Sequence, residues 1–546
     1  MAQRTANAAG TPSASPAAPP SPWGALRYPV FRSLWIATVV SNVGGWMFNA
    51  ASGWLMTSLS PSPLVVSLVQ VANSLPLFLF ALPAGALADM LDKRRLILWL
   101  EILTTALSAV FALLVTLHAV GPTLLLLFIL LLGTLTALET PAWQAIVPLL
   151  VPTSALSSAV AVNSVGVNIS RVIGPAITGG IIVGAGIAAP FWLDAFSNAG
   201  VIGVIFRWRP PPRATARALP AESLTGAIRA GVRYARYHRA LRATLVRAVG
   251  FFLFASAYWA LLPLVARSQL HGGPALYGTL LAVIGAGAVG GALFLPRMSA
   301  RLGADGVVVL GEAGTAVALV LFGLAHQPWV AALACLLAGI SWIAVLASLN
   351  VSAQTVLPDW VRGRGLAVYV TVFFGTLTIG SVLWGVAAEH LGLPAAHYLA
   401  GGGALIALWA TRRWKLQSGP PADLTPSMHW PEPVLAAGVD QNAGPVLVTV
   451  EYHVAPEHRE EFLAALGSLA RQRRRDGAYD WNVFEDTAHP ERIIETWLSD
   501  TWLDHLRQHR RFTRADRAVE ERVQRLAREP PHITHFIAAR PRRSAD

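Results

Sequence analysis

Charged residues are scarce in this chain: Asp, Glu, Lys and Arg make up 13% of its 546 residues, whereas 54% are hydrophobic. Soluble domains carry about 25% charged residues, so the composition argues against a chain made mainly of water-soluble domains. Cysteine is scarcer still, because Cys335 is the only one, and this excludes an intrachain disulfide. The first residues lack the apolar core of a signal peptide. We expect residues 1–25 to form a disordered cytosolic tail.

Long apolar runs take the place of the missing charge. They recur between Phe31 and Trp409, and at about 20 residues each they are long enough to cross a bilayer about 30 Å thick. We therefore predict an all-α polytopic membrane protein with twelve transmembrane helices. The predicted spans are residues 31–58, 64–88, 95–118, 122–141, 158–186, 190–206, 244–266, 275–296, 306–325, 328–350, 364–388 and 394–411.

Basic residues predict the orientation of these helices. One alternate set of connections is rich in Arg and Lys, whereas the other set contains Arg267 alone. Because basic loops stay in the cytosol, we expect a multi-pass protein of the bacterial inner membrane with both termini cytosolic. The residues on the predicted cytosolic side are Arg27, Arg32, Lys93, Arg94, Arg95, ten Arg from Arg207 to Arg247, Arg297, Arg301, Arg362, Arg364, Arg412, Arg413 and Lys415.

The positive net charge also has a membrane explanation. From Pro445 onward the chain contains 17 Arg and 17 acidic residues, so the net charge of +12 belongs to the apolar part. Such an excess is typical of membrane topology and of contact with anionic lipids. We therefore expect membrane lipids, and no nucleic acid, among the partners.

The longest basic connection, residues 209–243, is predicted to be a cytosolic linker between two bundles of six helices, residues 26–208 and 244–415. Several of its arginines recur at helical spacing. Two interpretations stay open: an amphipathic helix on the anionic inner leaflet, or a solvated linker helix whose arginines only enforce topology. These arginines are Arg229, Arg233, Arg236, Arg239 and Arg242.

Short motifs repeat between the two bundles. Gly85-Ala-Leu87 recurs as Gly291-Ala-Leu293, and Gln144-Ala-Ile-Val-Pro148 resembles Gln354-Thr-Val-Leu-Pro358. The two offsets nearly agree, and each pair occupies matching positions in the predicted topology. This pattern is typical of a transporter built from two parallel repeats, with its substrate site between the halves near the midplane.

A charged cluster follows the second predicted span, with the sequence Gly85-Ala-Leu-Ala-Asp89-Met-Leu-Asp-Lys93-Arg94-Arg95. It resembles a signature of the major facilitator superfamily, although Asp92 stands where glycine is usual. Gly85 would let helices approach closely. Asp89 would pair with a cation across the two halves, while Lys93 and Arg94 would neutralise the helix end. The resemblance implies a conformational gate that latches the outward-facing state.

The fifth predicted span is rich in glycine and contains a proline. It resembles the antiporter motif of drug/proton exporters in the same superfamily, in which small residues pack helices tightly and proline bends the helix. The alternative is an ordinary glycine-rich packing helix. The residues concerned are Gly166, Gly174, Pro175, Gly179 and Gly180.

Three further strings resemble one branch of the superfamily, the transmembrane secretion effectors, which include enterobactin exporters. They are Phe31-Arg-Ser-Leu-Trp35, Ser41-Asn-Val-Gly-Gly-Trp46 and Leu357-Pro-Asp-Trp-Val-Arg-Gly-Arg364. The resemblance covers residues 25–415 and implies a secondary active transporter, not an enzyme, without a cofactor. It implies export of a small siderophore-like or drug-like molecule by alternating access, with protons moving in the opposite direction.

Polar side chains inside the predicted spans are costly in a bilayer, so each is a candidate for function. Arg171 lies midway along the fifth span, which also contains Asn168. Asn42 and Asn49, seven residues apart in the first span, share one helix face. We expect Arg171 to face the central cavity, where it could attract an anionic substrate or hold a carboxylate. The alternative is a structural ion pair or a bond to a backbone carbonyl.

Three carboxylates are candidate proton carriers: Glu312 in the ninth span, Asp194 near the outer end of the sixth and Glu139 at the inner end of the fourth. Carboxylates within membrane segments commonly serve as proton relays. Glu139 and Asp194 also lie close enough to helix ends for a merely interfacial position. Glu312 lies deeper, in a helix that is usually peripheral in this superfamily.

The rest of the chain predicts a small soluble domain. A Pro-rich linker, residues 416–444, leads into segments that alternate like strands and segments with amphipathic helical spacing. Their β-α-β-β-α-β order predicts a ferredoxin-like α+β domain over residues 445–540. The predicted strands are 446–454, 479–485, 492–497 and 532–538, and the predicted helices are 456–475, 501–510 and 513–528.

This domain resembles the antibiotic biosynthesis monooxygenase superfamily, whose members pair into dimeric α+β barrels. The alternative function is therefore a membrane-anchored oxygenase, with a site built from His453, His505, His509, Trp481 and Trp502. No metal-ligand spacing, glycine-rich loop or nucleophile arrangement accompanies these residues, so we expect no metal site. A regulatory or dimerisation module, through which the chain could self-associate, is the favoured interpretation.

Reporter fusions test the predicted orientation. Reporters after Lys415 and within the connection from Arg209 to Arg242 should be cytosolic, and one near Gly272 should be periplasmic, because the Arg excess marks the cytosolic side. A periplasmic signal from a reporter at Arg229 would contradict this topology.

Overall fold

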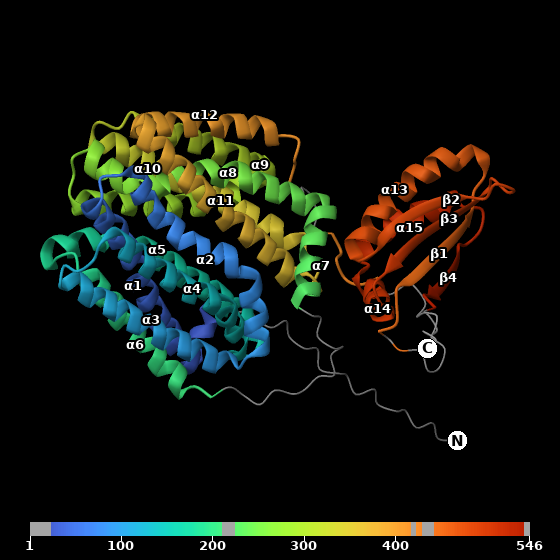
Figure 1. The fold of residues 1–546 in the computed structure, drawn as a ribbon, viewed down its shortest axis with the longest axis horizontal. Helices are drawn as coiled ribbons and strands as arrows, with labels where there is room; N and C mark the ends of the chain where they lie inside the picture. Colours follow the sequence, from blue (N-terminus) through green and yellow to red (C-terminus); the bar gives the residue numbers. More distant parts are fainter. Residues whose placement is uncertain (1–22, 210–223, 417–421, 428–439, 441, 540–546) are drawn as a thin grey trace, which may run out of the picture.

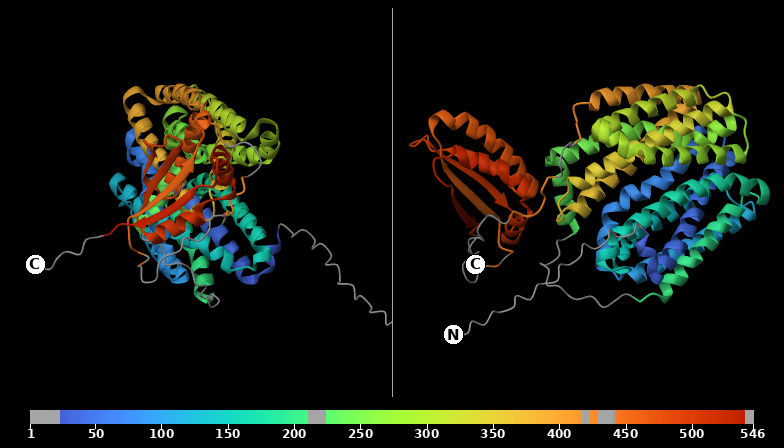
Figure 2. Two further views of the ribbon diagram at one scale, coloured as in Figure 1. Left: turned by 90° about the vertical axis from the view of Figure 1, so that its right-hand side faces the viewer. Right: turned by 180° about the vertical axis from the view of Figure 1, so that it is seen from behind.

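The computed structural model describes residues 23–209, 224–416, 422–427, 440 and 442–539, without the side chains of residues 86, 88–90, 224, 225 and 227. It consists of a long helical bundle and a small α+β domain at one end of it (Figures 1 and 2). Most of the predicted tail and much of the two predicted linkers lie outside the described residues. The described end of the tail is ordered, because the backbone N–H of Ala25 donates to Ser158 Oγ (3.0 Å).

The bundle is formed by eleven helices in the described ranges, and each predicted span overlaps one of them, with two spans falling on α9. Several begin with proline, which suits the first helical position because its missing N–H would be unpaired there anyway. The helices are α1 (Pro29–Leu59), α2 (Pro63–Met90), α3 (Lys93–Thr116), α4 (Pro122–Ile146), α5 (Leu156–Ala185), α6 (Ala189–Arg207), α8 (Arg239–Leu264), α9 (Pro274–Gly323), α10 (Pro328–Thr355), α11 (Arg362–Leu391) and α12 (Leu393–Thr411).

Ten helices in the described ranges are long and apolar enough to cross a membrane. Helix α1 is not among them, because Asn, Ser, Thr and Gly residues make it more polar. Helix α9 is 50 residues long and is broken at Gly303, where φ is 69° and ψ is 171°. Glycine adopts such a positive φ without steric cost. The break separates two arms, which match the predicted spans 275–296 and 306–325.

Large apolar side chains cover the outside of the bundle. Trp99, Phe196, Leu293 and Ile406 are each more than two-thirds exposed. Soluble proteins rarely expose apolar surface on this scale, whereas a bilayer favours it. The arrangement is that of a multi-pass membrane protein.

The bundle has two halves that lie side by side, α1–α6 and α8–α12 (Figure 1). The most extensive contacts between them are those of α2 with α11 and of α5 with α9. Each half has its own aromatic core. Phe48, Phe111 and Phe191 pack together in the first half, and Phe252, Trp342 and Phe373 in the second.

Helix α7 (Leu224–Tyr237) lies between the bundle and the C-terminal domain (Figure 1). On the bundle side, the buried Tyr234 hydroxyl donates to the Val356 carbonyl (2.9 Å). On the other side, Arg233 Nε donates to the Arg475 carbonyl (3.4 Å). The helical spacing of the arginines predicted a helix correctly. Its environment differs from both predicted interpretations, because these α7 side chains contact protein on two sides.

The C-terminal domain contains a four-stranded antiparallel sheet in the order β2-β3-β1-β4. Alternation in the first strand buries Val446, Val448, Val450 and Tyr452, and α13 and α15 pack apolar side chains against them. The strands are β1 (Val446–His453), β2 (Tyr479–Glu485), β3 (Arg492–Ser499) and β4 (His532–Ile537), and the helices are α13 (Arg459–Asp476), α14 (Trp502–Arg511) and α15 (Arg514–Leu526).

Candidate transport site

The two halves meet at the end of the bundle that lies away from the C-terminal domain. We call this the distal end and define it by the α1–α2 and α11–α12 turns. There, Glu389 of α11 accepts hydrogen bonds from Ser62 Oγ (2.7 Å) and from the Leu64 backbone N–H (3.2 Å). Further inside, the Ser74 and Thr378 hydroxyls are 2.8 Å apart. Helices α2 and α11 are therefore joined from the distal end to their middle.

Small residues let α5 and the first arm of α9 touch backbone to backbone. A Cβ added at Gly179 would lie 3.1 Å from the Cα of Ala275, and one added at Gly278 would lie 3.0 Å from the Gly179 nitrogen. Since real Cβ atoms are rarely so close to backbone, larger residues would push the two helices apart.

The other residues of the antiporter-like motif have different contacts. A Cβ at Gly166 would lie 2.7 Å from Trp35, and one at Gly174 would lie 2.8 Å from the Val43 carbonyl oxygen, so both glycines pack α5 against α1. Pro175 is buried within α5. A Cβ at Gly180 would meet no described atom within 4 Å. The motif thus serves two packing surfaces, one within the first half and one between the halves.

Arg267 also bridges the halves at the distal end. Its Nη1 donates to Thr57 Oγ1 (3.2 Å) and Ser58 Oγ (2.6 Å) of α1, and its guanidinium lies 5.5 Å from the centroid of the Trp54 ring. Trp54 in turn stacks on Tyr277 of α9. In the sequence, Arg267 stood out only as the lone basic residue of its set of loops. Its contacts could not be predicted, because its partners on α1 are distant in the chain.

Arg171 lies at the contact between α5 and α1. Its guanidinium is 5.1 Å from the centroid of the Trp46 ring, and its buried Nε has no hydrogen-bond partner among the described residues. Asn42 and Asn49 lie four residues before and three after Trp46, hence on the same face of α1, and Asn168 lies one turn before Arg171 on α5. The four predicted cavity residues therefore belong to two helix faces that meet at Trp46 and Arg171.

A cluster of carboxyl groups lies within the first half. Glu101 of α3 and Glu139 of α4 lie close enough to interact electrostatically with each other. Asp194 of α6 lies close enough to interact electrostatically with Glu101, and its Oδ2 accepts a hydrogen bond from Ser108 Oγ (2.7 Å). Glu101 was absent from the predicted set, although an acidic residue within the third span carries the same signal that selected Glu139.

Glu312 has a different environment in the second half. Its Oε2 lies 3.3 Å from Nη1 of Arg247, whose Nη2 lies 3.2 Å from Asp305. The Arg247 side chain is 1% exposed, and leaving a buried ion without its partner costs about 3–5 kcal/mol. These contacts favour a structural role for Glu312 over proton transport.

Arg94 of the predicted gate binds the end of α6. Its Nε donates to the Ile205 carbonyl (3.0 Å) and its Nη2 to the Phe206 carbonyl (2.6 Å), so it neutralises a helix C-terminus. Asp92, which replaces the usual glycine, caps α3 by accepting a hydrogen bond from the Arg95 backbone N–H (2.9 Å).

The structure shows fewer contacts for the other residues of the predicted gate. The predicted close approach at Gly85 is absent from this conformation, since a Cβ there would meet no described atom within 4 Å. Lys93 is the first residue of α3. The side chain of Asp89 lies outside the described part of the chain.

Comparison with known proteins decides the family. The family model described as transmembrane secretion effector matches residues 20–543. The chain belongs to the transmembrane secretion effector family. The resemblance read from its motifs is thereby confirmed, and the match to this family continues through the C-terminal sheet.

Curated relatives of this family member are transporters of the major facilitator superfamily. The staphyloferrin A transporter of Staphylococcus aureus is 25% identical over 361 residues, which cover 64% of this chain and 87% of that protein. The multidrug efflux pump Tap of Mycolicibacterium fortuitum is 26% identical over 377 residues, covering 66% and 89%. Nothing in these matches favours the oxygenase alternative.

A solved structure supports the same fold. An inward-facing, unoccupied bacterial homologue of the human lysosomal transporter Spinster superposes with a TM-score of 0.54 and 15% identity, covering 70% of this chain and 97% of that one.

Substituting Arg171 tests its place in the site. Because no described carboxylate pairs with it, Arg171→Ala should leave the amount of folded protein nearly unchanged and nearly abolish transport per folded molecule. Arg171→Lys should weaken transport, since it keeps the charge but loses the planar five-donor fork. Transport of a panel of carboxylate siderophores and drug-like dyes would be measured in vesicles, with exposed Arg413→Ala as control. Unchanged transport per folded Arg171→Ala molecule would remove Arg171 from the site.

Proposed function

We propose that this chain is a secondary active exporter of a small organic molecule in the bacterial inner membrane. One observation carries the proposal: two helical halves are joined at one end, and the interior holds Arg171 against Trp46 with no ion-pair partner among the described side chains. Such halves suit alternating access, in which they rock about a central site. Two relatives support the proposal: a siderophore transporter supports transport of a small organic molecule, and a multidrug efflux pump supports the outward direction.

The proposed topology has twelve spans. Helix α1 counts as one span, and the two arms of α9 count as two. Both termini are cytosolic, as the distribution of basic residues favours. The distal end is then periplasmic, and the conformation described above is closed toward the periplasm. An exporter in this state is ready to accept substrate from the cytosol.

The proposed substrate carries an anionic or otherwise oxygen-rich group, as siderophore-like molecules do and some drug-like molecules do. The Arg171 guanidinium has five N–H donors and remains charged, and the Trp46 ring beside it offers an apolar surface. Asn42, Asn49 and Asn168 add amide groups that both donate and accept.

Proton antiport is proposed to use the carboxyl cluster of the first half. Two carboxylates in contact repel each other when both are charged, and a proton shared between them relieves the repulsion. Glu101 and Glu139 are in this situation, with Asp194 nearby. Because α3, α4 and α6 hold these three groups, protonation can bias the position of the whole half.

The cluster of Gly85, Asp89, Lys93 and Arg94 is proposed to act as the gate of the opposite state. In the conformation described here Arg94 binds the end of α6 within its own half. Closing the cytosolic end would bring Asp89 toward a cation of the other half, as the superfamily signature implies.

The C-terminal domain is proposed to be a ferredoxin-like accessory module. The antiparallel order β2-β3-β1-β4 supports this fold, and contacts through α7 tie the domain to the bundle. A regulatory role is proposed, with self-association through the same domain as a further consequence of the fold.

Gradient-driven transport tests the proposed coupling. In inside-out vesicles with an acidic lumen, the wild type should accumulate a transported member of the siderophore and dye panel, and should stop when the pH gradient is collapsed. Glu139→Gln should lose this accumulation but retain exchange of labelled for unlabelled substrate at equal pH, because exchange needs no net proton movement.

Glu457→Gln is the matched control, since this residue is exposed in the C-terminal domain, away from the bundle. It should behave as the wild type. Gradient-driven accumulation by Glu139→Gln would exclude the carboxyl pair from coupling, and a wild type insensitive to the gradient would contradict proton antiport itself.

A further inference from the structure

Three histidines from separate parts of the sequence meet at one place in the C-terminal domain. His505 and His509 lie one turn apart on α14, hence on one face of that helix. His535 lies on β4, the edge strand of the sheet. The sequence shows only the first two as neighbours, so the group depends on the packing of α14 beside β4.

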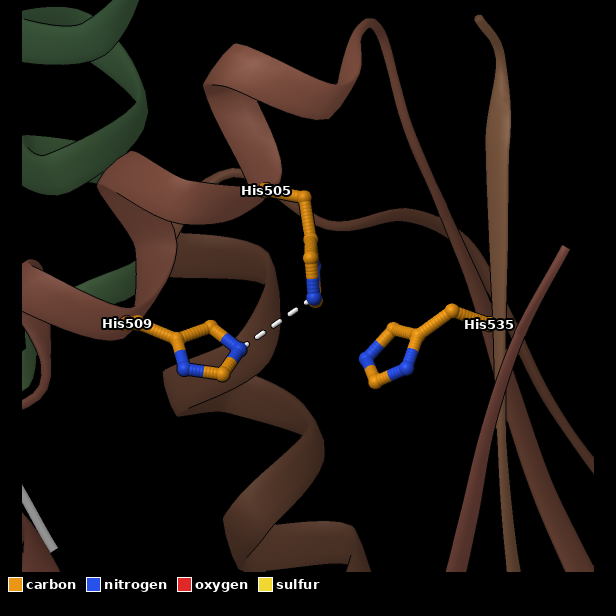
Figure 3. Close-up of side chains that lie close together, drawn as sticks. All are labelled: His505, His509 and His535. Carbon is orange, nitrogen blue, oxygen red and sulfur yellow. Dashed lines mark hydrogen bonds between the residues drawn. The ribbon is translucent and has the colours of Figure 1, made fainter. Parts of the chain in front are cut away.

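The three imidazoles turn ring nitrogens toward a common space (Figure 3). Nε2 of His505 and Nε2 of His509 are 3.2 Å apart, and one nitrogen from each of the three rings lies within 4.8 Å of the others. Ligand nitrogens around a tetrahedral ion with metal–nitrogen bonds of 2.0–2.1 Å are separated by about 3.3 Å. The first pair already has this separation, and a side-chain rotation of His535 would complete the set.

The different burial of the three histidines also fits a bound ion. His505 is 1% exposed. The Trp502 ring packs against both His505 and His535, which limits their freedom. His509 and His535 are only partly buried, so an ion has a path from solvent.

We propose that His505, His509 and His535 bind one divalent transition-metal ion of the class that prefers imidazole, with Zn²⁺ as its representative. Imidazole suits Zn, Cu, Fe and Ni, and three histidines with an open fourth position form a known zinc donor set. The site belongs to the accessory domain, and it is independent of the proposed transport activity.

Metal binding by the purified full-length chain tests the proposal directly. The protein carries an affinity tag without histidine, is stripped with chelator and is titrated with ZnCl₂ by calorimetry, and bound metal is counted by mass spectrometry. The wild type should bind one Zn²⁺ per chain. His509→Gln and His535→Gln should each bind at least about tenfold more weakly, since each removes a ligand. Co²⁺ in place of Zn²⁺ should give the visible bands of a low-coordinate site.

His532→Gln is the matched control, because His532 lies on the same strand and is exposed. It should bind Zn²⁺ as the wild type does. Thermal unfolding without metal establishes that the variants are folded, and added Zn²⁺ should raise the midpoint of the wild type only where the three histidines are intact. A wild type that binds no Zn²⁺, or folded His509→Gln and His535→Gln variants that bind it normally, would overturn the site.

Discussion

The cost of holding charge inside an apolar helical bundle is the constraint on which the rest of this structure depends. An ion at bilayer depth is tolerated when a partner, a cavity or a substrate replaces its water. Arg247 meets the constraint with Glu312 and Asp305 at 3.2–3.3 Å. Arg171 lies against the Trp46 ring, and its Nε has no hydrogen-bond partner among the described residues. The same constraint therefore separates an ion pair that supports the second half from a cation without an ion-pair partner in the described part of the chain.

The interface between the halves is also shaped by the cost of burying charge. At the distal end it consists of glycine contacts, hydroxyl groups and Glu389, which accepts from Ser62 and Leu64. Arg267 reaches the first half through two hydroxyl groups and the Trp54 ring. No ion pair between the halves is found among the described residues at this end, and hydrogen bonds without a paired opposite charge cost less to break than buried ion pairs. Such an interface suits an equilibrium between two states.

Local signals were enough to predict most of the elements. The length of the apolar runs predicted the membrane helices, and alternation such as that from Val446 to Tyr452 predicted the strands. The match to the secretion effector family likewise confirms the motif reading. Contacts between distant segments could not be predicted. Glu101 beside Glu139, His535 beside His505, and α7 between two domains all depend on tertiary packing. The expected close approach at Gly85 is not found among the described atoms.

The central claim is that the two halves must separate at the distal end during each transport cycle. The most direct measurement is transport by a chain with Ser62→Cys and Glu389→Cys, in a Cys335→Ala background that has no other cysteine. Oxidation should stop transport by the cross-linked molecules, and reduction should restore it. A control cross-link within the first half, between Ser41→Cys and Asn198→Cys, should leave transport intact. Normal transport by molecules with the distal cross-link would contradict the account.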